Sequence, residues 1–282
     1  MMKQTIPVIL GPTASGKTAY AIALAKKTNG AIISADSRQV YAGMNIGTAK
    51  PKEAWKTTPH AKEIPDIIDG IPHYLINIAS IDTPYTLSDW LADAKAALEH
   101  IIAQGQNPII AGGTMLYIDA LADGYSLPST PPNTALRAQL EQLSPEELYT
   151  KLISQDPDAA NFIEPHNSRR IIRALEVMHA TGKKFSELRT KTSSDYAYEK
   201  IGIFASWETV EQRITKRSQE MLREGLEQEK KTLAEEHPNS PLLQTVNYKE
   251  HSVEEMIRSN IRYAHRQMSW WKRSKYIGWI CV

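Results

Sequence analysis

Short apolar runs rich in β-branched residues recur along the chain, and helical patterns separate most of them. The runs that favour strands are residues 6–10, 31–34, 73–78, 108–111 and 201–205. Residues 18–27 have the composition of a helix, and a second helical pattern runs from a capping serine, Ser88, to Gly105. Strands that alternate with helices predict an α/β fold with a parallel sheet covered on both faces.

The alternation stops near Gly124 and returns at residues 200–206. A proline-rich break at 127–132 is followed by helical segments without a strand between them. Ser144 begins a capping box, and Ser168 is expected to cap a later helix. This change of pattern indicates a helical segment inserted into the α/β fold.

We therefore predict a P-loop α/β core made of residues 1–123 and 199–282, with an all-helical insertion at 124–198. Within the second part of the core, a single long helix is expected at 208–236. A segment in which basic residues are interleaved with aromatic ones follows it.

The first strand leads into a glycine-rich segment and then into a helical pattern. The segment has the spacing of a phosphate-binding loop and consists of Gly11, Pro12, Thr13, Ala14, Ser15, Gly16, Lys17 and Thr18. Its glycines allow main-chain N–H groups to face an anion at a helix N-terminus. Lys17 can reach a terminal phosphate, and the Thr18 hydroxyl can bind Mg²⁺. The motif predicts a polyphosphate ligand but no particular reaction, and a glycine-rich turn without a ligand is the alternative.

Polar residues also follow two of the other strands. Asp36 comes after the second strand, where open α/β sheets bind their ligands, and we expect it near the phosphate loop. Its carboxylate could accept a proton or bind Mg²⁺, and a solvated turn is the alternative. Gly112, Gly113 and Thr114 end another strand. The glycines permit close approach of a ligand that Thr114 could bind, or they serve only close packing.

Three arginines lie at the start of a predicted helix in the insertion. Arg169, Arg170 and Arg173 oppose the helix dipole there, which an external phosphate would offset. A solvated basic face is the alternative. Ile171 and Ile172, between them, have the spacing of core residues.

Arg217 lies within an apolar stripe of the helix predicted at 208–236. Val210, Ile214 and Met221 fall within about 60° of it on a helical wheel. A cation in such a stripe needs an anionic partner. The partner is either a bound phosphate or the carboxylate of an internal salt bridge.

Composition narrows the functional classes. The chain has 282 residues, 41% of them hydrophobic, and a net charge of only +1, so any nucleic-acid contact must come from local basic patches. Cys281 is the single cysteine, which excludes an internal disulfide and a zinc site built on several cysteines. We find no leader and no apolar run long enough to span a membrane, and we expect a cytoplasmic protein.

The motifs and their order resemble the tRNA dimethylallyltransferase (tRNA isopentenyl transferase) family. The matching segments are residues 11–18, 36–41, 43–51, Pro72-His73, 111–117, 170–177, Arg213-Ile214 with Arg217, and Arg266-Gln267. Members of the family transfer a dimethylallyl group from its diphosphate to N6 of the adenine immediately 3′ of the anticodon in certain tRNAs. The resemblance implies a P-loop NTPase-like core and a helical insertion that grips the anticodon stem-loop. We expect a monomer.

The resemblance also implies roles for single residues. The phosphate loop, from Gly11 to Thr18, would hold dimethylallyl diphosphate, with Mg²⁺ on Thr18. Asp36 would accept the proton of the attacking amine, while Lys17 and Arg217 stabilise the departing diphosphate and Thr114 completes the catalytic set. The residues matched to tRNA contacts are Asp36, Ser37, Arg38, Gln39, Thr114, Arg137, Arg169, Arg170, Ile171, Ile172 and Arg173.

The chain departs from the family pattern in four places. The segment between Pro51 and Pro72 is longer, and Arg169 replaces a common glutamine. Asn77 stands where many members have an aspartate, so we assign it no role. Asn247 stands where glycine is usual, which leaves the conformation of that loop open.

Three other functions would each explain part of this pattern. A small-molecule kinase would explain the loop and Asp36, but not the arginines of the insertion or the basic C-terminal segment. A prenyltransferase for free adenine nucleotides would need no grip on tRNA. An RNA-binding module with a vestigial nucleotide site conflicts with the intact Lys17, Thr18 and Asp36.

Overall fold

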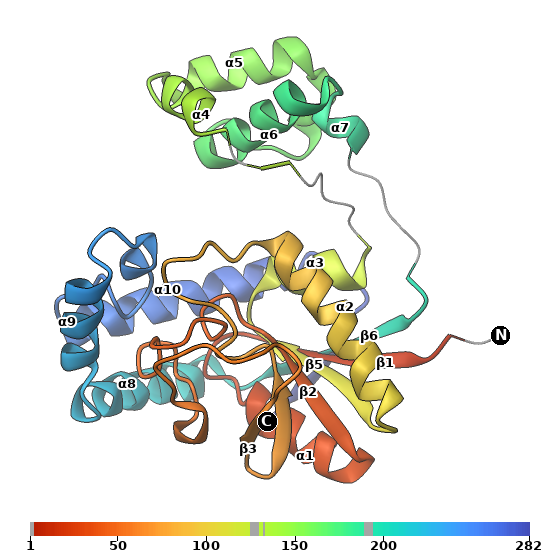
Figure 1. Cartoon of the computed structure of the whole chain (residues 1–282), viewed down its shortest axis with the longest axis vertical. Coiled ribbons are helices and arrows are strands. Elements are labelled where there is room, and N and C mark those ends of the chain that lie inside the picture. The colour runs from red at the N-terminus through yellow and green to blue at the C-terminus, as the bar shows by residue number, and fades with distance from the viewer. Residues whose placement is uncertain (1–2, 125–129, 132, 189–193) are drawn as a thin grey trace. The chain divides into compact units, whose positions relative to one another are not determined.

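The computed structural model describes residues 3–124, 130–131, 133–188 and 194–282. It separates into two compact units, one formed by Met1–Ala122 with Asp195–Val282 and the other by Asp123–Ser194 (Figure 1). These limits lie close to the boundaries predicted for the core and the insertion. Most of the proline-rich break, residues 127–129 and 132, lies outside the described residues.

The larger unit is built on a seven-stranded sheet, which confirms the predicted α/β class. Its order is β3-β4-β2-β5-β1-β6-β7, and every neighbouring pair is parallel except β3 and β4. The strands are β1 (Thr5–Leu10), β2 (Gly30–Ala35), β3 (Asp66–Ile68), β4 (Ile71–Tyr74), β5 (Asn107–Gly112), β6 (Ala197–Phe204) and β7 (Gly278–Cys281). The strand predicted at 73–78 stops at Tyr74, because Leu75 and Asn77 adopt left-handed φ values of 63° and 55°.

Helices cover both faces of this sheet. Alternate residues of β1 point to opposite sides, so Val8 belongs to the core under α2 (Leu87–Ala103) and α3 (Met115–Ala122), and Ile9 to the core under α1 (Lys17–Thr28). Figure 1 shows α2 and α3 on one side of the strands and α1 on the other. Trp90 of α2 is fully buried and donates its indole N–H to the Ser34 carbonyl, which fixes α2 on β2.

Two predicted helix limits in this unit were wrong. Thr86, not Ser88, caps α2, because the Thr86 hydroxyl and the Asp89 carboxylate form a reciprocal capping box. The helix expected at 208–236 is two helices, α8 (Trp207–Arg223) and α9 (Leu226–Glu236). Gly225 separates them with a φ of 101°, a conformation that glycine adopts without strain.

The last helix, α10 (Val253–Trp271), packs against α8 and α3. Short 3₁₀ turns, η1 (Lys52–Ala54) and η3 (Pro241–Gln244), lie in the connections of this unit. Helices α8 and α10 therefore bring residues from the end of the chain to the side of β1, where the phosphate loop begins.

The smaller unit is helical in its described residues. It contains α4 (Thr134–Leu140), α5 (Pro145–Gln155), the 3₁₀ turn η2 (Pro157–Asn161), α6 (Ser168–Thr181) and α7 (Phe185–Leu188). The capping box at Ser144 is confirmed. Asn167, not Ser168, caps α6, since its side chain accepts from the Arg170 N–H. No helix among the described residues of either unit is long and apolar enough to cross a membrane.

Candidate active site

The phosphate loop joins the end of β1 to the start of α1. Gly11 and Gly16 have φ values of 147° and 100°, and Ala14 is also left-handed at 61°. A Cβ at Gly11 would overlap the carbonyl oxygen of Ile203 on the neighbouring strand β6. Glycine is therefore required at Gly11 by both its φ and its surroundings, which is a stronger reason than the spacing of the motif alone.

Lys17, the first residue of α1, turns its ammonium back over this loop and donates to the Pro12 carbonyl at 2.7 Å. Burial, and to a smaller extent the nearby Arg217 cation, lower the pKa of Lys17 to about 7, while Asp36 acts in the opposite direction. A lysine with such a pKa is only partly charged at neutral pH, and a bound anion would favour its charged form.

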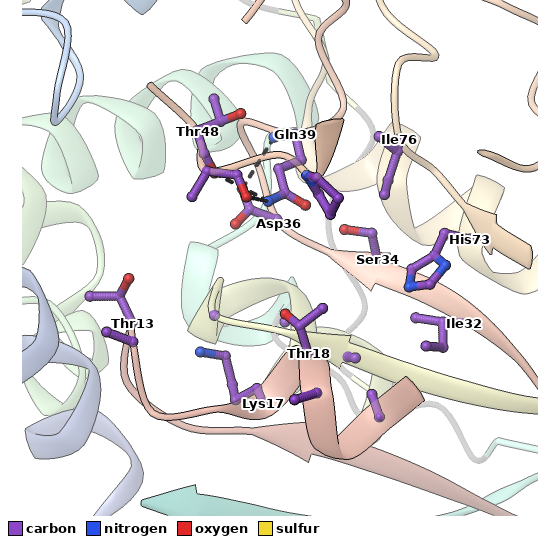
Figure 2. Close-up of a pocket in the computed structure, with 18 of the residues that line it drawn as sticks. Thr13, Lys17, Thr18, Ile32, Ser34, Asp36, Gln39, Thr48, His73 and Ile76 are labelled. Atoms are coloured by element: carbon purple, nitrogen blue, oxygen red, sulfur yellow. Dashed lines mark hydrogen bonds between the residues drawn. The ribbon is translucent and has the colours of Figure 1, made fainter. Parts of the chain in front are cut away.

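Asp36 lies directly after β2, as predicted from its position at a strand end. Its Oδ1 atom accepts from the main-chain N–H groups of Arg38 at 2.8 Å and Gln39 at 3.2 Å. These bonds fix the carboxylate and leave Oδ2 without a partner among the described residues. Asp36 and Lys17 line the same cavity, which measures about 310 Å³ (Figure 2). The predicted meeting of the carboxylate and the lysine at one site is confirmed.

Thr114 supports this arrangement from outside the cavity. Its hydroxyl accepts from the Ser37 N–H at 2.9 Å, and its own N–H donates to the Ala35 carbonyl at 3.0 Å. Thr114 therefore holds the turn that carries Asp36. A Cβ at Gly112 would overlap the main chain of Ala35, so close packing explains that glycine.

Arg217 reaches the site from α8. It donates from one terminal nitrogen to the Thr13 hydroxyl at 2.9 Å and to the Asn260 amide oxygen at 3.3 Å, and its buried Nε has no partner among the described residues. The structure shows no salt bridge between Arg217 and a carboxylate of the described chain, so the salt-bridge interpretation is not supported. Burial lowers the pKa of Arg217, and the predicted apolar neighbours Val210 and Ile214 are fully buried.

Gln267 of α10 is a part of the site that we did not predict. Its Oε1 accepts from the Thr13 N–H at 2.7 Å, and its Nε2 donates to the Gly113 carbonyl at 2.8 Å. It is almost completely buried beside Ala264 and Met268 on the same helix. The signal was present in the sequence, because a glutamine among core positions needs partners for both ends of its amide.

The cavity continues from Thr18 and Asp36 toward the strands β2 and β4. Its other lining residues include Gln39 and Thr48 near Asp36, and Ser34, Ile32 and Ile76 on the opposite side (Figure 2). Gln39 donates to the carbonyl oxygens of Thr48 and Ala49, at 3.1 and 3.4 Å. The segment that follows Asp36 is thus tied to the loop around Gly47.

Asn77 and Asn247, the two asparagines that differ from the family pattern, both form hydrogen bonds that fit their positions. Asn247 adopts the left-handed φ of 75° that glycine would favour, and its side chain donates to the Gly47 carbonyl at 2.8 Å. Asn77 is fully buried, accepts from the Lys50 ammonium at 2.6 Å and donates to the Asp66 carboxylate at 2.8 Å. Asp66 lies in the longer segment, so that segment supplies the carboxylate that position 77 lacks.

In the smaller unit, Arg137 and Arg173 share one buried carboxylate. Glu176 receives a hydrogen bond from Arg137 at 2.6 Å, and Arg173 lies 3.7 Å from the same oxygen. Arg169 and Arg170 lie on the surface of α6. Ile171 and Ile172 are core residues, so the expectation that they contact tRNA is wrong for their side chains.

A mostly parallel sheet whose first strand leads through this loop into α1, with Lys17, Asp36 and Arg217 at the loop, defines a P-loop protein. A family model described as IPP transferase matches residues 39–274, and one described as isopentenyl transferase matches residues 4–58. The chain belongs to the IPP transferase family.

Individual relatives agree with this assignment over nearly the whole chain. A tRNA dimethylallyltransferase of Geobacillus kaustophilus is 38% identical over 297 residues, covering 99% of this chain and 90% of the relative. The crystal structure of a tRNA isopentenylpyrophosphate transferase from Bacillus halodurans is 32% identical, with a TM-score of 0.68 and coverage of 99% of this chain and 90% of that one. A eukaryotic dimethylallyltransferase acting on tRNA has a TM-score of 0.81 at 27% identity, covering 99% and 74%.

Proposed function

We propose that this protein transfers a dimethylallyl group from dimethylallyl diphosphate to N6 of the adenine on the 3′ side of the anticodon in tRNA. The observation that carries the proposal is the shared cavity of Lys17 and Asp36. The transfer needs a site for the leaving diphosphate and a base for the attacking amine. A cation and a carboxylate in one cavity provide both.

The diphosphate would lie in the phosphate loop, on the main-chain N–H groups between Thr13 and Thr18 and on the Lys17 ammonium. The buried Nε of Arg217, beside this loop, has no partner in the part of the chain that the structure describes, and Arg217 would neutralise charge as the diphosphate leaves. The same anion also returns Lys17 to its charged form, because a nearby negative charge raises the pKa of an amine.

The residues present also fit a Mg²⁺ ion. The Thr18 hydroxyl faces the cavity, and no group of three histidine, cysteine or acidic side chains among the described residues could hold a metal (Figure 2). Mg²⁺ binds in such sites mainly through substrate phosphates and water. When bound, it would neutralise developing charge on the diphosphate oxygens.

The adenine must leave its stack to bring its amine into the cavity beside Asp36. As the bond from N6 to the allylic carbon forms, the bond from that carbon to the diphosphate oxygen breaks, and the amine proton passes to Asp36. The hydrocarbon tail would occupy the part of the cavity lined by Ile32, Ile68 and Ile76. Apolar side chains there exclude water from the allylic carbon, which favours amine attack over hydrolysis.

The tRNA would be held by both units. In the smaller unit, Arg137, Arg169, Arg170 and Arg173 are the cations proposed to contact phosphates, and Ser37, Arg38 and Gln39 lie beside the proposed base. Base flipping and phosphate contacts are the usual means of reaching a loop nucleotide of RNA. We further propose that the enzyme acts as a monomer in the cytoplasm.

The proposal is tested by incubating the purified protein with Mg²⁺, dimethylallyl diphosphate and unmodified tRNA, and by analysing the tRNA nucleosides by mass spectrometry. Isopentenyladenosine in the tRNA supports the proposal. Parallel reactions replace the tRNA by AMP, or the prenyl donor by ATP. Modification of AMP without modification of tRNA, or phosphoryl transfer from ATP alone, would refute it.

A further inference from the structure

Two buried asparagines lie between Arg217 and the loop around Gly47. Asn260, on α10, is 3% exposed, and Asn247, in the segment that precedes α10, is 5% exposed. A buried amide needs hydrogen-bond partners for both its oxygen and its nitrogen. The partners of these two side chains therefore show what they connect.

The two amides form a chain of hydrogen bonds that all run in one direction. One terminal nitrogen of Arg217 donates to the Asn260 oxygen at 3.3 Å, and the Asn260 nitrogen donates to the Asn247 oxygen at 2.6 Å. The Asn247 nitrogen donates in turn to the Gly47 carbonyl at 2.8 Å. A further bond from the Asn260 nitrogen to the Met256 carbonyl, at 2.9 Å, keeps the Asn260 oxygen turned toward the arginine. In such a chain each bond polarises and strengthens the next.

The loop at one end of this chain belongs to the side of the cavity where the tRNA nucleotide is proposed to enter. Thr48, next to Gly47, lines the cavity near Asp36 (Figure 2). The carbonyls of Thr48 and Ala49 accept from the Gln39 side chain. Gln39 lies in the segment proposed to contact tRNA. The position of this loop therefore affects how the tRNA side of the site is held.

At the other end of the chain, Arg217 has an unused donor. One of its terminal nitrogens donates to both Asn260 and the Thr13 hydroxyl, while its buried Nε has no partner among the described residues. The N–H groups of a guanidinium lie in one rigid plane. An anion bound at Nε would fix that plane, and with it the direction of the bond to Asn260. A bound diphosphate should therefore order the chain of hydrogen bonds as far as Gly47.

We propose that Asn247 is a positioning residue that couples donor binding to tRNA binding. The diphosphate on Arg217 orders the loop around Gly47, and the tRNA then loses less conformational entropy when it binds the ordered loop. By linkage, tRNA raises the affinity for the donor by the same factor. Glycine at position 247 would have no amide, and the chain of bonds would end at Asn260. The inference rests on the proposed prenyl transfer.

The test measures tRNA affinity with and without an unreactive donor. Dimethylallyl S-thiolodiphosphate serves as the donor analogue, because sulfur replaces the oxygen of the bond that must break. Filter binding of unmodified tRNA in the presence of Mg²⁺, without and with saturating analogue, gives two Kd values, and their ratio is the coupling factor. We expect a coupling factor of about 5 or more in the wild type, and less than about half of the wild-type value in Asn247→Gly.

Both the variant and its control keep the backbone that they need. Asn247 has a left-handed φ of 75°, which glycine adopts without strain, so Asn247→Gly should fold. Asn29→Gly is the matched control. Asn29 is also left-handed, with a φ of 50°, but it is exposed and caps the C-terminal end of α1. The coupling factor of Asn29→Gly should equal that of the wild type.

The outcomes distinguish coupling from a purely structural role. If Asn247 only supported the loop, Asn247→Gly would weaken tRNA binding equally with and without the analogue, and an unchanged coupling factor would overturn the proposal. A wild-type coupling factor of about 1 would also overturn it. A separate reaction with dimethylallyl diphosphate tests the proposed function. Failure of the wild type to form isopentenyladenosine there would overturn the prenyl transfer itself.

Discussion

The protonation of Lys17 should control the affinity for the prenyl donor. Burial and the Arg217 cation bring the pKa of Lys17 to about 7. The ammonium is therefore charged below this pH and loses its charge as the pH rises through it. With a pKa near 7, about half of the free enzyme carries the charge at pH ~7, and about one-hundredth at pH ~9.

If only the charged form binds the diphosphate, affinity should fall by up to about 50-fold between pH ~7 and ~9. Little of this comes from the donor, since a phosphate with a pKa near 6 is already ionised above pH ~7. Binding above neutrality should also take up a proton. Isothermal titration calorimetry with dimethylallyl diphosphate, in two buffers of different ionisation enthalpy, measures both the affinity and the proton uptake.

Arg217→Ala tests the coupling between the two cations. Loss of a charge-assisted interaction should weaken donor binding at neutral pH by roughly 10- to 100-fold. Removing the like charge should also raise the pKa of Lys17, so the fall in affinity moves to higher pH. In Lys17→Met, the donor affinity should not fall as the pH rises, and binding should take up no proton. A wild-type affinity that is constant between pH ~7 and ~9, or an Arg217→Ala profile identical in shape to the wild type, would refute this reasoning.

Three further changes test other parts of the site. Asp36→Asn keeps an acceptor for the turn but removes the base, so kcat should fall by ~10²–10⁴-fold while tRNA affinity, measured by filter binding, changes little; unchanged kcat would exclude Asp36 as the base. Gln267→Leu removes the acceptor of the Thr13 N–H and leaves the Gly113 carbonyl only its 3.4 Å bond from the Tyr263 hydroxyl, so kcat/KM for the donor should fall by about 10-fold or more, whereas Gln212→Leu on the exposed side of α8 should have no effect; equal effects would contradict the bridging role. Glu176→Gln should lower the free energy of unfolding in urea by about 1–2 kcal/mol, because its arginine partners are only half-buried, and Glu164→Gln should not.

Local spacing was enough to predict the phosphate loop and the carboxylate. The loop is set by residues within a few positions of each other, and Asp36 follows from the rule that strand ends meet at one edge of a sheet. Arg217 was predicted for a similar reason, since a cation inside a helical stripe conflicts with its apolar neighbours. Each of these inferences started from residues that are close together in the sequence.

The contacts that were missed join distant parts of the chain or depend on backbone conformation. Gln267 meets Thr13 across 254 positions of sequence, which no local pattern encodes. The early end of β4 depends on the left-handed conformation of Leu75, a residue that rarely adopts it. Gly225 is a recognisable signal for the end of a helix. The helical pattern of apolar residues continues on both sides of it, however, so the sequence predicted one helix instead of two.

The bridge from Gln267 to Thr13 and Gly113 sets an order of events during translation. A ribosome adding about 5–20 residues per second takes roughly 10–50 s to go from the phosphate loop to the last helix. During that interval the nascent chain contains the phosphate loop and the turn at Gly113, but it lacks Gln267, which joins them. Polypeptides released early, which lack Gln267, should therefore bind the prenyl donor more weakly than the finished chain.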